Sequence, residues 1–249
     1  MADTETLTIA SEAGRDYDAY LARPSGARAT AVLVLHDMFG LNAPIRDYAD
    51  GLAQHGFAVL VPNLFWRSEI PGVIPYDDAQ HPAAWARLKA LDLGVVTADM
   101  TTAVHWLRAQ PCCNGKVAAV GFCGGGRFAY LAAARCGVDA AASLYGLGIS
   151  EHLGEPVRCP LQLHYGLKDL HVPLKEIDAV ATGVKGQANV ELFRYAQAGH
   201  SFANPVRPSY DPAAARLATE RIDAMLKMLK SGVGAAPRSN SCPGRNAAP

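Results

Sequence analysis

The sequence predicts an α/β protein with a mostly parallel central sheet flanked by helices. Short apolar runs rich in β-branched residues alternate with helix-length segments along most of the 249 residues, which is typical of repeated βαβ units rather than of a β-sandwich. Half of the residues are hydrophobic, so a chain of this length can bury a sizeable core. We expect one domain over residues 1–230. Residues 231–249 are rich in Gly, Pro, Ser and Ala without apolar periodicity, and we expect a disordered tail there.

The predicted elements follow one another in crossover order. Buried strands are expected over residues 31–35, 57–63, 116–122, 140–146, 160–166 and 190–196. Helices are expected over residues 45–55, 83–110 with a break near Gly94, 125–136, 174–182 and 212–230. Gly56 ends the first helix. Because Pro71, Pro75 and Pro82 prevent a regular element throughout residues 64–82, we interpret this long connection as a lid or pocket wall.

Charge and composition exclude several classes of function. The 23 basic residues balance 23 acidic ones, so neither disorder nor electrostatic nucleic-acid binding is favoured. No apolar run reaches the roughly 18 residues that a membrane span needs, and the first ten residues carry no basic flank or apolar signal core. We therefore expect a cytoplasmic protein. The six cysteines form no CxxC pair or Cys/His cluster with zinc spacing, so we expect reduced thiols and no metal.

The most informative stretch is a glycine-rich junction between a buried strand and a helix, KVAAVGFCGGGRFAYLAAA. The strand ends in G-x-C-x-G, from Gly121 through Cys123 to Gly125, and the helix begins at once, which is the pattern of a nucleophile elbow. So tight a turn would hold Cys123 in a strained conformation at the positive end of the helix, where a thiolate is favoured. The alternative is that Cys123 is a buried structural cysteine and that the glycines serve helix–strand packing.

Two further candidates follow later strands. Asp169 lies just beyond residues 160–166, where a parallel sheet presents functional side chains, and His200 lies in a glycine-flanked loop after residues 190–196. Alone, Asp169 could be a turn or helix-capping residue and His200 an ordinary loop histidine. With Cys123 they occur in the chain order of an α/β-hydrolase triad. Cys123 would then attack an acyl carbon and His200 would move protons, while Asp169 would fix the imidazole tautomer and stabilise its charged form.

The first predicted strand ends in LHDMFG, where this architecture places an oxyanion-hole donor. We expect the backbone N–H groups of Met38 and Gly124 to bind the oxyanion, and Asp37 to point towards the nucleophile. Alternatively, His36 and Asp37 are loop residues that satisfy backbone groups. A thiol nucleophile suits activated esters and lactones, whose acyl-enzyme must then be released by water.

Five segments together resemble the dienelactone hydrolases, α/β-hydrolases with a catalytic cysteine. They are HDMFGLN (36–42), VPNLFWR (61–67), NGKVAAVGFCGGG (114–126), YGLKDLHVP (165–173) and AGHSFANP (198–205). The resemblance covers about residues 5–230. It implies that Cys123, Asp169 and His200 form the triad and that no metal or organic cofactor is needed. It also implies that a butenolide ring is opened, as when dienelactone becomes maleylacetate in chloroaromatic degradation.

The sequence departs from the family's pattern around the expected substrate site. Asp37 stands where family members usually have glutamate, and Trp85 where a tyrosine is usual. Asn204 and His81 stand where the family's arginines grip the substrate carboxylate. Arg67 and Arg207 could compensate, although an arginine near a pocket is more often part of a surface ion pair. We expect the substrate to contact Phe39, Arg67, His81, Trp85, Phe202, Asn204 and Arg207.

The first hypothesis is a monomeric, cysteine-dependent hydrolase of small lactones or esters, with a small molecule as its only partner. A broader carboxylesterase or thioesterase is the alternative among enzymes. From a different class, the fold could serve as a binding or thiol-sensing protein with Cys123 as an oxidisable switch. A sensor has no use for Asp169 and His200 in hydrolytic order, so the hydrolase is favoured.

Overall fold

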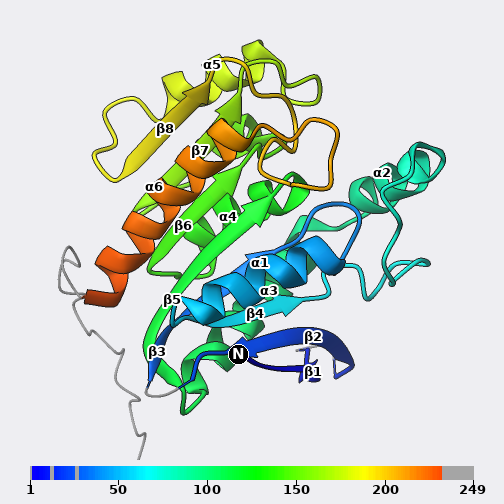
Figure 1. Ribbon diagram of the computed structural model, residues 1–249, viewed down its shortest axis with the longest axis vertical. Helices are drawn as coiled ribbons and strands as arrows, with labels where there is room; N and C mark the ends of the chain where they lie inside the picture. The colour runs from blue at the N-terminus through cyan, green and yellow to red at the C-terminus, as the bar shows by residue number, and fades with distance from the viewer. Residues whose placement is uncertain (1, 12–13, 26–27, 232–249) are drawn as a thin grey trace, which may run out of the picture.

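The protein is built around one eight-stranded sheet, seen in a computed structural model that describes residues 2–11, 14–25 and 28–231 (Figure 1). The strand order is β1-β2-β4-β3-β5-β6-β7-β8. Neighbouring strands are parallel from β4 to β8, and only β1 and β2 run antiparallel to their neighbours. The mostly parallel sheet that the sequence predicts is therefore confirmed.

All six predicted strands form, and their burial explains why they could be predicted. They are β3 (Ala29–Leu35), β4 (Ala58–Pro62), β5 (Cys113–Phe122), β6 (Ala140–Leu144), β7 (Leu161–Gly166) and β8 (Val190–Tyr195). Strands β3, β4, β6 and β7 are buried at every position, which requires continuous apolar runs. Alternate residues of β3 enter opposite cores: Leu33 and Leu35 join one, and Val32 and Val34 join the other.

Helices cover both faces of the sheet (Figure 1). They are α1 (Ala43–Gln54), α2 (His81–Lys89), α3 (Leu93–Ala109), α4 (Gly124–Arg135), α5 (Leu174–Gly183) and α6 (Pro212–Ser231). Leu52 of α1 and Met225 of α6 belong to one core, whereas Met100 of α3 and Phe128 of α4 belong to the other. Asn42 caps α1 by accepting from the Ile45 N–H, so this helix begins two residues earlier than predicted. Within the described residues, no helix is long and apolar enough to cross a membrane.

The sequence prediction omitted an amino-terminal hairpin. Strands β1 (Asp3–Ala10) and β2 (Asp16–Arg23) pair antiparallel, and β2 joins the sheet beside β4. Most residues of β1 are exposed because it is an edge strand. It therefore lacks the apolar run that marks the inner strands.

Residues 83–110, expected as one helix with a break near Gly94, form parts of two helices. Helix α2 starts at His81, and Asp92 caps α3 by accepting from the Val95 N–H, so the break falls at residues 90–92. Segment 64–80 holds only the short 3-10 turn η1 (Asp78–Gln80) as regular structure, as its prolines predict. At the other end, the predicted tail over 231–249 lies outside the described residues except for Ser231, where α6 ends.

Candidate active site

Cys123 occupies the tight turn between β5 and α4. Its φ of 56° and ψ of −118° lie in a region that residues with side chains rarely adopt. Glycines make this turn possible: a Cβ on Gly121 would lie 1.9 Å from the Gly125 carbonyl oxygen, and a Cβ on Gly125 would lie 2.1 Å from the Leu35 carbonyl oxygen. The elbow thus places the buried Cys123 at the positive end of the α4 dipole.

Asp169 holds His200 from the loop after β7. Oδ2 of Asp169 lies 2.7 Å from Nδ1 of His200, and Oδ1 accepts from the N–H groups of His171 at 2.7 Å and Val172 at 2.9 Å. The Asp169 side chain is entirely buried. The Asp169 carboxylate therefore organises a turn and also orients the imidazole of His200.

His200 is coupled to Cys123 on its other side. Nε2 of His200 is buried and has no hydrogen-bond partner among the described residues. Burial by itself lowers the pKa of His200, but the charge of Cys123 and the hydrogen bond with Asp169 outweigh burial and raise the pKa to about 10. The imidazolium is thereby favoured at neutral pH, between the carboxylate and the sulfur.

The turn after β3 presents the Met38 N–H as a donor, and His36 fixes the backbone around it. Nδ1 of His36 donates to the Asp37 carbonyl at 2.8 Å, and Nε2 accepts from the Leu64 N–H at 3.1 Å. Burial lowers the pKa of His36 to about 4, so the ring is neutral and these two bonds define its tautomer. His36 therefore satisfies backbone groups. In the described part of the chain, the N–H groups of Met38 and Gly124 donate to no protein acceptor.

Asp37 is bonded to segment 64–80, through Tyr76, rather than to the thiol. Its Oδ1 accepts from the Phe39 N–H at 2.9 Å, and its Oδ2 accepts from the Tyr76 hydroxyl at 2.8 Å. Burial raises the pKa of Asp37, although both hydrogen bonds oppose the rise. The Tyr76 hydroxyl in turn accepts from Nδ2 of Asn42 at 2.9 Å and from Nδ2 of Asn204 at 3.0 Å. Asn204, expected to contact substrate, thus directs its amide to Tyr76.

Arg207 lies against an aromatic wall on the same side of the site. Its guanidinium carbon is 5.4 Å from the Phe39 ring centre and 5.1 Å from that of Tyr76. Its Nη2 lies 3.3 Å from Nε2 of His81, and its buried Nε has no partner among the described residues. The structure therefore brings Arg207, His81 and Phe39 together beside the Asp37 network.

Two of the other expected substrate contacts differ in their access to the site. Trp85 reaches it from α2, because its ring centre lies 5.5 Å from that of His171, which itself lies 4.8 Å from that of His200. Phe202 is fully buried, with its ring centre 5.3 Å from that of Tyr145. Phe202 thus supports the His200 loop from within the core.

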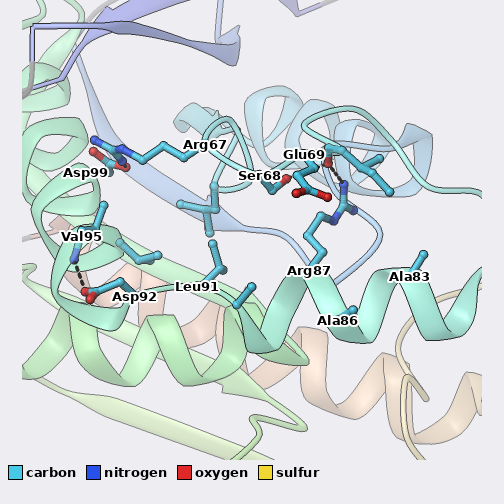
Figure 2. A pocket seen from close by; sticks show the side chains of 14 residues that line it. Arg67, Ser68, Glu69, Ala83, Ala86, Arg87, Leu91, Asp92, Val95 and Asp99 are labelled. Atoms are coloured by element: carbon cyan, nitrogen blue, oxygen red, sulfur yellow. Dashed lines mark hydrogen bonds and ion pairs between the residues drawn. The ribbon is translucent and has the colours of Figure 1, made fainter.

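Arg67, expected to contact the substrate, lies instead beside Asp99 (Figure 2). It forms an ion pair with the buried Asp99 of α3, and its guanidinium carbon lies 3.7 Å from the Trp66 ring centre. Both charged residues line a cavity of about 550 Å³ between segment 64–70 and helices α2 and α3, and Cys123 does not border it. A second cavity, of about 270 Å³, borders Asp37.

Sequence reasoning did not single out three residues that complete the surroundings of the site. Tyr76 lies in segment 64–82, which its prolines indicate to be a lid or pocket wall. That position in the sequence could have identified it. Tyr145 follows directly after β6, and its ring centre lies 5.0 Å from that of His200. Its position just past a strand is the signal that also identified Asp169. His171 lies close to Asp169 in the chain, and this nearness is the only sequence signal that could have identified it.

The sequence and the fold are both similar to those of known dienelactone hydrolases. Residues 17–230 match the dienelactone hydrolase family. A carboxymethylenebutenolidase of Pseudomonas putida is 34% identical over 222 residues, which cover 88% of this chain and 94% of that protein. Carboxymethylenebutenolidase 1 of Cupriavidus pinatubonensis is 31% identical, covering 91% and 98%. The crystal structure of a putative dienelactone hydrolase from Klebsiella pneumoniae superposes with a TM-score of 0.83 at 25% identity, covering 91% of this chain and 99% of that one. The chain belongs to the dienelactone hydrolase family, with its α/β-hydrolase fold.

Proposed function

We propose that the protein hydrolyses small lactones and esters through a covalent acyl-enzyme on Cys123. Its family makes it a hydrolase of lactone or ester bonds, and the proposal adds the reacting residues and the intermediate. The observation that carries it is the strained position of Cys123 at the start of α4, with the His200–Asp169 pair coupled to it. A buried structural cysteine would need neither the strain nor the pair.

Acylation would begin with attack of the Cys123 sulfur on the acyl carbon. The carbonyl electron pair moves onto oxygen, and the N–H groups of Met38 and Gly124 receive the resulting oxyanion. The oxyanion then collapses, the ester C–O bond breaks, and His200 gives its Nε2 proton to the departing alkoxide. The products are a thioester on Cys123 and a neutral imidazole, with the alcohol still attached to the acyl group if the substrate is a lactone.

Deacylation would reverse the proton transfer with water as the nucleophile. Neutral His200 takes a proton from water while the oxygen attacks the thioester carbon, and the same N–H groups hold the second oxyanion. The Cys123 thiolate leaves, the carboxylic acid product is released, and His200 returns as imidazolium. Asp169 stabilises this charged form in both steps through its 2.7 Å hydrogen bond.

We further propose that Arg207 binds a substrate carboxylate. Its guanidinium lies beside the Asp37 network, and its Nε has no protein partner within the described residues. Asn204 is a weaker candidate because its amide already donates to Tyr76. An arginine holds a carboxylate by charge-assisted hydrogen bonds in a fixed geometry, which favours anionic lactones over neutral esters.

Replacement of the sulfur tests the catalytic proposal. We expect Cys123→Ala to abolish hydrolysis of dienelactone and of p-nitrophenyl acetate, because no nucleophile remains at the elbow. Cys136→Ala is the matched control, since this buried cysteine follows α4 at its other end, and it should keep wild-type kcat/KM. Hydrolysis that survives in the Cys123→Ala variant at a rate within tenfold of wild type would refute the proposal.

A further inference from the structure

Arg87, on the buried side of α2, connects three backbone carbonyls. Its Nη2 donates to the Met38 carbonyl at 2.7 Å, and its Nη1 donates to the carbonyls of Ile70 at 2.8 Å and Gly72 at 2.6 Å. The guanidinium carbon lies 3.9 Å from the Phe65 ring centre, and the residue is only 5% exposed. Figure 2 shows the side chain reaching from α2 towards the lid segment. Burying a guanidinium costs free energy. Its bonds to three carbonyls in two different loops therefore indicate that Arg87 has a function in holding these loops.

The Met38 carbonyl belongs to the peptide next to the proposed oxyanion donor. At the other end of this peptide, the Phe39 N–H donates to Asp37 at 2.9 Å, so the side chains of Arg87 and Asp37 hold its two ends. His36 holds the carbonyl of the preceding peptide, whose N–H is that of Met38. With both peptides fixed, the direction of the Met38 N–H is fixed as well.

We propose that Arg87 is a positioning residue that aims the Met38 N–H at the oxyanion formed during acyl transfer. The inference rests on the proposed function and names a residue that supports the same site from outside it. Arg87 itself would not touch the substrate.

The packing around the hydrogen bond between Arg87 and the Met38 carbonyl leaves little room for another arrangement of this loop. A Cβ on Gly40, whose φ is +90°, would lie 3.4 Å from Nη2 of Arg87 and 3.3 Å from the Gly72 carbonyl oxygen. Met38 is 4% exposed, so its carbonyl could reach water only if the loop moved. Without Arg87, the buried carbonyl would lose a charge-assisted hydrogen bond. Because the Met38 Cα joins the two peptides, a movement of the Met38–Phe39 peptide towards another donor would also shift the Met38 N–H away from the reacting carbonyl.

A positioning role and a purely structural role predict different kinetics. Arg87 also holds Ile70 and Gly72, so loosening the lid alone would weaken substrate binding and raise KM. Loss of oxyanion stabilisation instead lowers kcat, because the oxyanion exists only near the transition state. Alkylation by iodoacetamide separates the positioning role from the structural role further. The Cys123 sulfur displaces iodide directly and no oxyanion forms, so loss of oxyanion stabilisation should not slow this reaction.

The experiment compares Arg87→Ala with wild type using p-nitrophenyl acetate and iodoacetamide. We expect kcat to fall about tenfold to a hundredfold, at or below the loss caused by deleting an oxyanion donor. KM should stay within about threefold, and the rate of Cys123 alkylation within about twofold. Arg216→Ala is the matched control, because this exposed arginine of α6 pairs with Glu220 on the same helix, and it should alter none of these values.

Chemical rescue adds a second readout. Arg87 borders the cavity of about 550 Å³, so methylguanidinium has a route to the space that Arg87→Ala opens. Added methylguanidinium should raise kcat of Arg87→Ala severalfold and leave wild type and Arg216→Ala unchanged. A failure of rescue would count against a role that depends on the guanidinium.

The inference is overturned if Arg87→Ala raises KM with kcat unchanged, or if it slows alkylation as much as acylation. Should Arg87→Ala fail to fold, Arg87→Lys decides the question. Its ammonium keeps the charge but cannot span three carbonyls, so kcat should fall severalfold at unchanged KM, and a wild-type kcat would refute the role. A wild-type enzyme that forms no acyl-enzyme on Cys123 refutes the proposed function instead, whereas Cys123 acylation at the wild-type rate in Arg87→Ala refutes only the role of Arg87.

Discussion

Tyr76→Phe removes the hydroxyl that joins the lid to the site. This oxygen donates to Asp37 and accepts from Asn42 and Asn204. Losing a hydrogen bond to a charged carboxylate costs about 1.5–3 kcal/mol, and each neutral bond adds about 1 kcal/mol where water cannot replace it. Because Tyr76 is only partly buried, water can replace part of this loss. We expect a net cost of about 2 kcal/mol, which lowers the melting temperature by about 4–8 °C for a chain of this size.

Tyr165→Phe is the matched control. Tyr165 is fully buried in β7, and its hydroxyl has no hydrogen-bond partner among the described residues. Its removal should leave stability unchanged or slightly increased, because no hydrogen bond is lost. Thermal and urea unfolding of both variants, with kcat/KM for an ester, measure the difference. A Tyr76→Phe variant as stable as Tyr165→Phe would show that the hydroxyl network does not hold the lid.

Three further predictions concern the elbow, the histidine and the arginine. Gly125→Ala should prevent folding or cost more than about 4 kcal/mol, because its Cβ would lie 2.1 Å from a carbonyl oxygen. Gly51→Ala, inside α1 with nothing within 4 Å, should stabilise by about 0.5–1 kcal/mol in urea unfolding. Since the pKa of His200 is raised to about 10, kcat/KM should fall as pH rises through that value, and Asp169→Asn should move this alkaline limb to lower pH in a pH–rate profile. Arg207→Gln should reduce the kcat/KM preference for dienelactone over a neutral lactone by roughly tenfold to a hundredfold, and an unchanged preference would place the carboxylate elsewhere.

The raised pKa of His200 also determines how the stability of the folded protein changes with pH. A pKa raised above the ordinary value of 6.5 contributes stability that is fully present below that pH and is lost as pH rises through about 10. Stability of the Asp169→Asn variant should therefore depend less on pH over that interval. Urea unfolding at several pH values measures this difference.

The inner strands were predictable because burial on both faces demands apolar runs, as in β3 and β7. The hairpin was not, because β1 is an exposed edge strand whose polar residues resemble a loop. Similarly, the glycines around Cys123 marked the elbow in the sequence itself, since only glycine fits the contacts that the turn makes.

Residues that act through long-range partners were harder to predict. Arg67 lies beside a tryptophan in the sequence, but Asp99, which neutralises it, lies 32 positions away on α3. Tyr76 and Arg87 belong to the lid segment and to α2, and only the fold brings them to the loop after β3. Nothing in the local pattern of either residue indicates that contact.

The measurement that tests the central claim most directly is mass spectrometry of the enzyme quenched in acid during turnover of p-nitrophenyl acetate. We expect one acyl group per chain, released by hydroxylamine as expected of a thioester, and peptide mapping should assign it to Cys123. His200→Gln should accumulate the adduct far more slowly, because the imidazolium that stabilises the attacking thiolate is absent. Turnover without an adduct, or an adduct on any other residue, would contradict the account.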